Sequence, residues 1–549
     1  MQGLMQGWPL TVDKILDHAA DRHGARELVS RPIEGGPVVR TTYRALRSRA
    51  KTLSAALKAF GIKPGDRVAT LAFNTARHVE AWYGVMGMGA VCHTLNPRLF
   101  AEQLAYIINH AEDRLIFADI CAAPILEGVL PHCPKVEAVV WLTSEAHRPA
   151  SPAGGALMSV AQEDFIAGCS DDFAWGGFPE TEAAGLCYTS GTTGHPKGVL
   201  YSHRSNYLHT LMSLQADVTG LSSSDNVLMI VPMFHANAWG LAFSAPAVGA
   251  KLVLPGNQMD GAAILELLET EEVTFAGAVP TVFQMLLQHL EKTGARLPHL
   301  NKVVIGGSAC PEALIRTFHD RYQVEVIHLW GMTEMSPMGS VGQPCASVAA
   351  MPYAQQLPYR VKQGRIPLGV DIKLADEEGK TLPCDGTTFG RLMVRGHSVV
   401  DSYFRGEGGA LLDAEGFFDT GDVATICPYG YIQITDRAKD VIKSGGEWIS
   451  SIEIENLASG HPKAALAAVV GLPHPRWDER PLLIVQLRPG ETATRDEFLH
   501  FLDGKIAKWW TPNDVVFDTI PLGATGKIDK KLIRKKYEGY RWPETTAAE

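Results

Sequence analysis

The feature that most constrains the fold is a repeated alternation of short apolar runs with amphipathic stretches of helical period. Six runs rich in Val, Ile and Leu are predicted to be buried strands, at residues 67–73, 137–143, 226–233, 273–280, 302–308 and 324–330. Amphipathic stretches suited to helices lie between them, at residues 42–61, 261–273, 280–292 and 310–322. This order predicts an α/β layered fold with a substantially parallel sheet.

The pattern changes after about residue 365. Residues 371–376, 390–396 and 426–437 predict shorter antiparallel strands separated by acidic and glycine-containing turns. From about residue 440 the chain carries its own strands, at 464–472 and 482–489, together with helices. These segments suffice for a small separate α+β domain.

Composition limits the class of protein. A chain of 549 residues is expected to form two to four structural units. The net charge of −10 argues against a general nucleic-acid binder. Nine cysteines without a C-x-x-C pair fit a reducing cytosol, and Asp13, Lys14 and Asp17 interrupt the stretch that a signal peptide would keep apolar. No apolar run approaches the roughly 18 residues of a membrane span, so we expect a soluble cytoplasmic protein.

The segment Tyr188–Val199, Y-T-S-G-T-T-G-H-P-K-G-V, carries the strongest functional signal. It follows the apolar run 184–187 and combines hydroxyl side chains, glycines and Lys197. Small residues let backbone N–H groups approach phosphate oxygens, while hydroxyls and a lysine add donors and charge. A P-loop is excluded by spacing, because Pro196 replaces a required glycine and Gly198 replaces the metal-binding hydroxyl.

This segment resembles the phosphate loop of the adenylate-forming (ANL) superfamily, which includes acyl-CoA synthetases, aryl-CoA ligases, luciferases and peptide-synthetase adenylation domains. Six further motifs of that superfamily follow in order: V-P-M-F-H-A-N-A-W (231–239), G-G-S-A (306–309), W-G-M-T-E (330–334), T-G-D (420–422), D-R-A-K-D-V-I-K-S-G-G-E-W-I-S (436–450) and T-G-K-I (525–528). Segments such as H-T-L-N-P-R-L (93–99) look closest to bacterial fatty-acid–CoA ligases, including the methylmercaptopropionate–CoA ligase branch.

The resemblance implies a two-step, AMP-forming ligation. A carboxylate attacks the α-phosphate of ATP to give acyl-AMP and pyrophosphate, and the thiol of coenzyme A then displaces AMP. The implied architecture is a large domain, residues 1–436, of layered α/β subdomains plus a small antiparallel β region, followed by a small mobile α+β domain, residues 437–549. A hinge is expected near Lys439, and a homodimer is common in the superfamily.

The resemblance also assigns roles to individual residues. Glu334 and Thr189 are expected to bind Mg²⁺, since that ion prefers oxygen ligands. Lys527 is expected to bridge the attacking carboxylate and the α-phosphate, and His235 to act as a gate between acyl pocket and thiol tunnel, although an apolar run can also hold a core histidine. The ATP and coenzyme A contacts are expected from Thr189, Ser190, Gly191, Thr192, Lys197, Gly307, Trp330, Gly331, Thr333, Asp422, Arg437, Lys439, Lys443, Ser444, Gly445 and Trp448.

The acyl pocket is expected to involve His235, Trp239, Val279 and Gly307. A large indole at the pocket floor favours short- to medium-chain fatty or thioether acids, whereas Trp239 facing a core would leave chain length open. Between Asp225 and Asp260 there is no acidic residue to pair a substrate ammonium, which argues for an uncharged acyl tail.

Other functions fit the sequence less well. A serine hydrolase would need a glycine where Cys310 stands, and Gly84, Gly87 and Gly89 carry a dinucleotide-binding spacing in reverse. Ser398 lies in a string that mimics a phosphopantetheine attachment site, but no separate carrier domain surrounds it. Three alternatives stay open: a free-standing adenylation enzyme that loads an acyl carrier protein, an aryl-propenoate–CoA ligase, and a non-catalytic binding module.

Overall fold

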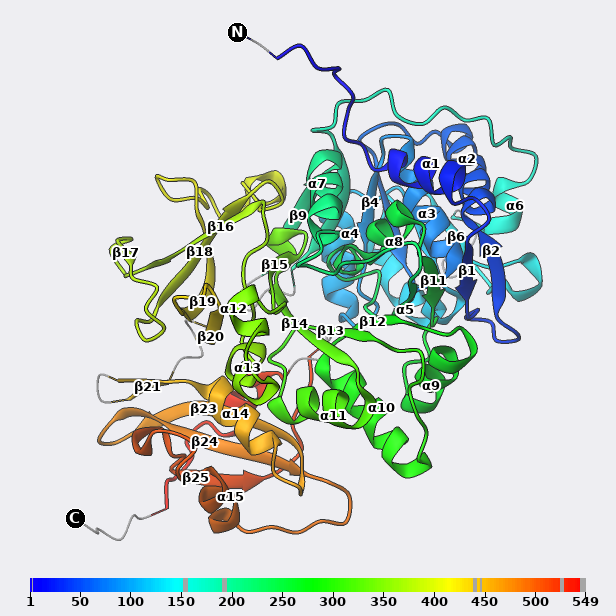
Figure 1. Ribbon diagram of the computed structural model, residues 1–549. Coiled ribbons are helices and arrows are strands. Elements are labelled where there is room, and N and C mark those ends of the chain that lie inside the picture. The colour runs from blue at the N-terminus through cyan, green and yellow to red at the C-terminus, as the bar shows by residue number, and fades with distance from the viewer. Residues whose placement is uncertain are drawn as a thin grey trace.

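The computed structural model describes residues 1, 3–151, 157–189, 195–437, 442–444, 447–523 and 528–543, with the backbone alone for residues 436, 437, 443, 447 and 448. Its described strands form four sheets (Figure 1). The largest is parallel at its centre and has antiparallel edges. Its order is β15 (Met338–Val341), β14 (Glu325–Gly331), β13 (Lys302–Ile305), β12 (Phe275–Ala278), β10 (Asn226–Met229), β11 (Lys251–Leu254), β1 (Glu27–Ser30) and β2 (Val39–Thr42).

A second sheet is parallel except for its last pair of strands. Its order is β7 (Met158–Ala161), β6 (Ala138–Trp141), β5 (Leu115–Ala118), β3 (Arg67–Leu71), β4 (Val91–Thr94), β8 (Ala183–Tyr188) and β9 (Gly198–Ser202). Both sheets therefore confirm the parallel α/β fold predicted from the alternating pattern.

Alternate side chains of these strands enter different cores. In β10, Val227 and Met229 lie in the core shared by the two sheets, whereas Leu228 lies in a core on the opposite face. In β3, Val68 enters the shared core and Ala69 enters a third core. Because successive strand residues point to opposite faces, both sheets are covered on both sides, which explains their unbroken apolar sequences.

Helices supply the covering layers. The shared core includes residues of α1 (Asp13–Arg22), α2 (Tyr43–Phe60), α3 (Ala76–Gly87), α7 (His203–Ser213) and α8 (Leu241–Val248). The outer face of the first sheet is covered by α9 (Gly261–Thr270), α10 (Pro280–Thr293) and α11 (Glu312–Tyr322), and that of the second by α4 (Ala101–Ala111) and α5 (Ala123–Val129). The shorter helices are α6 (Gln162–Ile166), α12 (Ala346–Ala349), α13 (Tyr353–Arg360), η1 (Ile120–Ala122), η2 (Leu130–His132), η3 (Glu145–His147), η4 (Ala236–Gly240), η5 (Thr333–Met335), η6 (Phe404–Gly406) and η7 (Lys508–Trp510).

The third sheet is antiparallel and follows residue 365, as expected. Its order is β17 (Thr381–Leu382), β16 (Val370–Ala375), β18 (Gly390–Gly396), β19 (Phe418–Ile426) and β20 (Ile432–Arg437). The expectation of one strand over residues 426–437 was wrong. A turn separates β19 from β20, because the N–H of Gly430 donates to the carbonyl of Cys427 at 2.7 Å and reverses the chain.

The C-terminal part has its own sheet and its own cores. The order is β22 (Glu447–Ile449), β21 (Ile442–Ser444), β24 (Asp478–Leu487) and β23 (Ala464–His474), with β25 (Asp514–Phe517) parallel to β24. Helices α14 (Ser451–Ser459), α15 (Arg495–Leu502) and α16 (Lys530–Lys536) pack on it, and two apolar clusters lie within this part of the chain. Figure 1 shows this unit, in orange and red, below the third sheet.

Among the described residues, no helix combines the length and the apolar character that crossing a membrane requires.

Candidate active site

Several of the predicted site residues follow the carboxyl ends of parallel strands. In the first sheet β10, β12, β13 and β14 run parallel, so the segments that follow them emerge at one edge. His235 follows β10, Val279 follows β12, Gly307 follows β13, and Thr333 and Glu334 follow β14. The topology of the sheet therefore gathers residues that lie up to 99 positions apart in the sequence (334 − 235).

The predicted phosphate loop is the connection between β8 and β9. These strands pair antiparallel, with Tyr188 opposite Gly198. The N–H of Thr189 donates to the carbonyl of Lys197 at 2.9 Å, and the N–H of Lys197 lies 3.4 Å from Thr189 Oγ1. The two ends of the loop are thus joined, while Ser190, Gly191 and Thr192 lie outside the described residues.

The hairpin is joined to the segment after β14. Tyr201, on β9, donates its hydroxyl hydrogen to the carbonyl of Thr333 at 2.7 Å. Glu334, the next residue, is 8% exposed, and its Oε1 accepts a 2.7 Å hydrogen bond from the Tyr403 hydroxyl. Burial and the neighbouring carboxylate raise the pKa of Tyr403, so this residue remains a hydroxyl donor. Lys197 Nζ lies 4.9 Å from the centre of the Tyr403 ring. One tyrosine therefore contacts both the predicted metal ligand and the predicted phosphate-binding lysine.

Asp422 reaches the same region from the third sheet. Its carboxylate is buried, and Oδ2 accepts a 3.0 Å hydrogen bond from the indole N–H of Trp330. Asp422 lies directly opposite Arg437 in the pairing of β19 with β20. Both residues are among the expected nucleotide contacts, and the structure joins their side chains directly.

Two glycines at the site satisfy steric requirements. Gly307 has φ of 81°, a left-handed conformation that favours glycine. A Cβ at Gly331 would lie 2.0 Å from the carbonyl oxygen of Pro337. Both positions therefore need the absence of a side chain, as expected where backbone passes close to other groups.

The segment expected to form the gate and the pocket has an unusual backbone. Ala236, Asn237, Ala238 and Trp239 all have positive φ, between 33° and 56°. Such runs are costly for L-residues and persist where the surroundings impose them. Asn237 donates a buried 3.1 Å hydrogen bond to Asn206 Oδ1 of α7, which holds the turn in place. The half-buried His235 precedes this turn, and Trp239 is buried in the shared core.

Three of the predicted residues of the C-terminal part, Lys443, Ser444 and Trp448, lie on described strands. Lys443 and Trp448 are opposite one another in the β21–β22 pairing. Ser444 is fully buried, and its Oγ accepts a 3.1 Å hydrogen bond from Arg480. Lys439, Gly445 and Lys527 lie outside the described residues; Lys527 belongs to the connection between Leu522 and Ile528, which form an antiparallel bridge.

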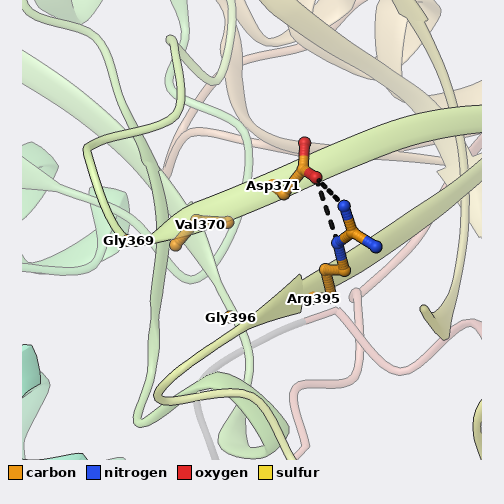
Figure 2. A pocket seen from close by; sticks show the side chains of 5 residues that line it. All are labelled: Gly369, Val370, Asp371, Arg395 and Gly396. Carbon is orange, nitrogen blue, oxygen red and sulfur yellow. Dashed lines mark hydrogen bonds and ion pairs between the residues drawn. The ribbon is translucent and has the colours of Figure 1, made fainter. Parts of the chain in front are cut away.

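A surface cavity of about 360 Å³ lies apart from the predicted residues (Figure 2). Gly369, Val370, Asp371, Arg395 and Gly396 line it. Asp371 and Arg395 are directly opposite on β16 and β18, and Arg395 Nη2 lies 2.8 Å from Asp371 Oδ2. This ion pair is half exposed and joins two strands, so it is a cross-strand contact of modest energy.

Ser398, two residues beyond β18, is buried, and its carbonyl accepts from the Ser336 hydroxyl, which is consistent with a structural role.

Comparison with known proteins identifies the family. Residues 16–404 match the AMP-binding enzyme family, and residues 453–527 match the AMP-binding enzyme C-terminal domain. The chain therefore belongs to the AMP-binding enzymes, in agreement with the resemblance inferred from its motifs.

Several relatives span almost the full chain. The chain is 48% identical to the 3-methylmercaptopropionyl-CoA ligase of Ruegeria lacuscaerulensis, over 98% of this chain and 99% of the relative. It is 46% identical to the medium-chain-fatty-acid–CoA ligase of Ectopseudomonas oleovorans, over 98% of each protein. Among solved structures, the ATP-bound MatB of Rhodopseudomonas palustris covers 97% of this chain at 26% identity with a TM-score of 0.79, and this chain covers 100% of it. An anthranilate CoA ligase in complex with anthranoyl-AMP has a TM-score of 0.85 at 24% identity, covering 97% of this chain and 99% of its own, and supports the fold.

Proposed function

We propose that this AMP-forming acyl-CoA ligase acts on short- to medium-chain acids with an uncharged tail, including thioether acids such as 3-methylmercaptopropionate. The observation that carries the proposal is the meeting of three elements at one sheet edge: the β8–β9 hairpin, the Thr333–Glu334 segment and Asp422. They are linked by the Tyr201–Thr333, Tyr403–Glu334 and Trp330–Asp422 hydrogen bonds. Because Trp239 is buried in the shared core and so leaves chain length open, the substrate class rests on relatives named for a thioether acid and for medium-chain acids, at 46–48% identity.

The first step joins two anions, so the site must offset negative charge. We assign phosphate binding to Thr189, Lys197 and Thr333, and the ribose hydroxyls to the Asp422 carboxylate, which Trp330 holds in place. A carboxylate oxygen of the acid attacks the α-phosphorus, and the bond from that phosphorus to pyrophosphate breaks. Lys527 would add positive charge at the attacked phosphate, where charge accumulates in the transition state.

A magnesium ion fits the oxygen donors present. Glu334 and Thr189 offer a carboxylate and a hydroxyl, and the described residues contain no cluster of three or more His, Cys, Asp or Glu that could enclose an ion. Mg²⁺ commonly takes one or two protein ligands and completes its shell with phosphates and water. When bound, it would neutralise charge on the phosphates of ATP.

In the second step the coenzyme A sulfur attacks the acyl carbon, the bond from that carbon to the AMP oxygen breaks, and the thiol proton is released. We propose that His235 stands between the acyl pocket and the thiol path, next to the Asn237-anchored turn. Lys443, Ser444, Gly445 and Trp448 are proposed coenzyme A contacts.

We further propose that residues 1–436 and 437–549 are the two moving units, with the hinge at Lys439. The separate apolar cores of the C-terminal part support this division. A homodimer is a further proposal, which light scattering after size-exclusion chromatography would test.

A panel of acids tests the substrate class. Acid- and CoA-dependent AMP formation should be compared for straight-chain acids from C2 to C16, 3-methylmercaptopropionate and 3-phenylpropenoate. We expect the highest kcat/KM for C4 to C10 acids and the thioether acid. A maximum at C16 or at the aryl acid would overturn the assignment, and AMP release that requires a carrier protein instead of coenzyme A would favour the carrier-loading alternative.

A further inference from the structure

A group of polar and aromatic side chains lies at the two ends of the phosphate loop and has no part in the mechanism above. It consists of residues from β4, α4 and the connection after α4, the β8–β9 hairpin and the segment after η6, and we call it the Tyr188 cluster. Its members are His93, Tyr106, His110, Asp113, Tyr188, His195 and Glu407.

Tyr188 immediately precedes Thr189 and is the centre of the cluster. Its hydroxyl oxygen lies 2.6 Å from His110 Nδ1, and His110 Nε2 lies 3.5 Å from Glu407 Oε1. Burial, with nearby negative charge, raises the pKa of Tyr188, so its hydroxyl keeps its proton. The Glu407 carboxylate can only accept, which places the ring hydrogen of a neutral His110 on Nε2 and leaves Nδ1 to accept from the Tyr188 hydroxyl. The remaining ring N–H of His110 then faces the carboxylate of Glu407.

The other end of the loop is held by the same carboxylate. The Tyr106 hydroxyl donates to Glu407 Oε1 at 3.1 Å, and the Tyr106 ring stacks on His195 with ring centres 4.4 Å apart. His195 lies two residues before Lys197. Glu407 therefore connects, through two side chains of α4, to residues on both sides of the phosphate loop.

Buried side chains also pack against the cluster. His93 and Asp113 are both fully buried, with 2.7 Å between Nδ1 and Oδ2, and the His93 ring lies 5.1 Å from the Tyr188 ring. A Cβ at Gly198 would lie 3.0 Å from Phe404 Cβ and 3.2 Å from Tyr188 Cζ. The hairpin is thus packed closely against the segment that carries both Tyr403 and Glu407, and Tyr403 contacts Lys197 and Glu334.

The Glu407 carboxylate uses only one of its two oxygens in these contacts. Its Oε2 is buried without a hydrogen-bond partner among the described residues. We infer that Tyr188, His110 and Glu407 are positioning residues that set the spacing of the two ends of the phosphate loop, and so determine ATP affinity. This inference rests on the proposed assignment of the loop to ATP phosphates.

The test compares Tyr188→Phe and Glu407→Gln with the wild-type protein. Tyr43→Phe is the control, because Tyr43, which is fully buried whereas Tyr188 is half-buried, also makes one hydroxyl hydrogen bond, to the carbonyl of Ala250 at 2.6 Å. The Kd for ATP with Mg²⁺ is measured by calorimetry, and the two half-reactions are measured separately. We expect both cluster variants to raise the Kd about five- to tenfold, which corresponds to about 1–1.4 kcal/mol, and to leave thioester formation from supplied acyl-AMP within twofold. The control should leave both values within twofold.

Two further measurements distinguish positioning from a general loss of stability. The Kd for ATP of the double variant should be no higher than that of the single variant with the higher Kd. Both changes interrupt the same series of contacts through His110, so their effects should not add. Tyr106→Phe, which keeps the ring on His195 and removes one hydroxyl, should raise the Kd about two- to threefold. An unchanged Kd, an equal effect of Tyr43→Phe, or equal loss of both half-reactions would overturn the inference. If ATP binds but no acid yields acyl-CoA, the proposed function fails while the comparison of Kd values still stands.

Discussion

At the scale of single residues, Asp119 is a buried carboxyl group whose environment opposes its charge. It follows β5, is 1% exposed, and its Oδ2 accepts the N–H of Phe73 at 2.7 Å. Burial raises the pKa of Asp119 to about 7, although the Phe73 N–H acts in the opposite direction. The carboxyl group is therefore protonated in the folded protein over a pH range in which it would be ionised in the unfolded chain.

This shift predicts how stability depends on pH. Because the pKa of Asp119 is higher in the folded protein than in the unfolded chain, its contribution to the free energy of unfolding is fully present below the unfolded pKa, 3.8. That contribution is lost as pH rises towards 7. Asp119→Asn keeps an oxygen acceptor for Phe73 and never ionises. Between pH 5 and 7 the variant should therefore gain stability relative to wild type, by about 1.4 kcal/mol per pH unit. Thermal unfolding of both proteins at pH 5, 6, 7 and 8 provides the measurement, and a difference in Tm that stays constant with pH would contradict the assigned cause.

Residue-scale contacts were the least predictable from sequence. The motifs predicted Glu334, Asp422 and Trp330 as site residues; in the structure Trp330 contacts Asp422 of another sheet, and Glu334 follows the strand that carries Trp330. Tyr403 lies 69 positions from its partner Glu334 and belongs to none of the recognised motifs. The Trp330–Asp422 bond spans 92 positions. Such pairs depend on how sheets pack together, and the pattern along one segment contains no signal for them.

At the scale of elements, the strands and helices were largely predictable because both buried sheets impose apolar runs. Strands β3, β6, β12 and β13 lie within the ranges expected from sequence, and α2 matches its expected range closely. The turn between β19 and β20 is not predictable from the pattern, because residues 427–431 continue an apolar and aromatic stretch around Gly430.

The end of α11 gives an element-scale prediction. Gln323 follows the last helical residue with φ of 56°, is exposed, and its N–H donates to the carbonyl of His319. Glycine adopts this left-handed conformation without the steric cost that other residues incur. Gln323→Gly should therefore stabilise the protein by about 0.5–1 kcal/mol, because relief of a left-handed conformation that costs about 1–2 kcal/mol outweighs about 0.4–1 kcal/mol of added chain entropy in the unfolded state.

The control is Arg321→Gly, at an exposed position in the last turn of the same helix. Glycine inside a helix costs about 1 kcal/mol, so this variant should be destabilised. Urea midpoints of the two variants should move in opposite directions. A decrease for both would show that glycine entropy outweighs the backbone conformation at position 323.

At the scale of the whole molecule, the account requires two arrangements of two units around one site. Lys527 and the β21–β22 hairpin belong to the same small unit, about 80 positions apart, and the proposal gives each a different half-reaction. One rigid arrangement would not place both against the same reacting atoms, so a few linker residues must change conformation.

Two variants should separate the half-reactions in opposite ways. Lys527→Ala removes charge at the attacked phosphate, so acid-dependent pyrophosphate release should fall about 10²- to 10³-fold while supplied acyl-AMP still reacts with coenzyme A. Lys439→Pro fixes φ near −65°, so adenylation should persist while thioester formation falls by orders of magnitude. Each half-reaction is followed separately by pyrophosphate release and by thioester formation. An equal, modest loss of both steps in Lys439→Pro would place the hinge elsewhere.

The most direct test of the central claim is the product stoichiometry of the wild-type enzyme. Purified protein is incubated with ATP, Mg²⁺, coenzyme A and 3-methylmercaptopropionate or octanoate, and the phosphorus-containing products and the thioester are quantified together. Each acyl-CoA should be accompanied by one AMP and one pyrophosphate, and acyl-AMP should accumulate when coenzyme A is omitted. Formation of ADP and phosphate, or of acyl-CoA without AMP, would contradict an AMP-forming ligation.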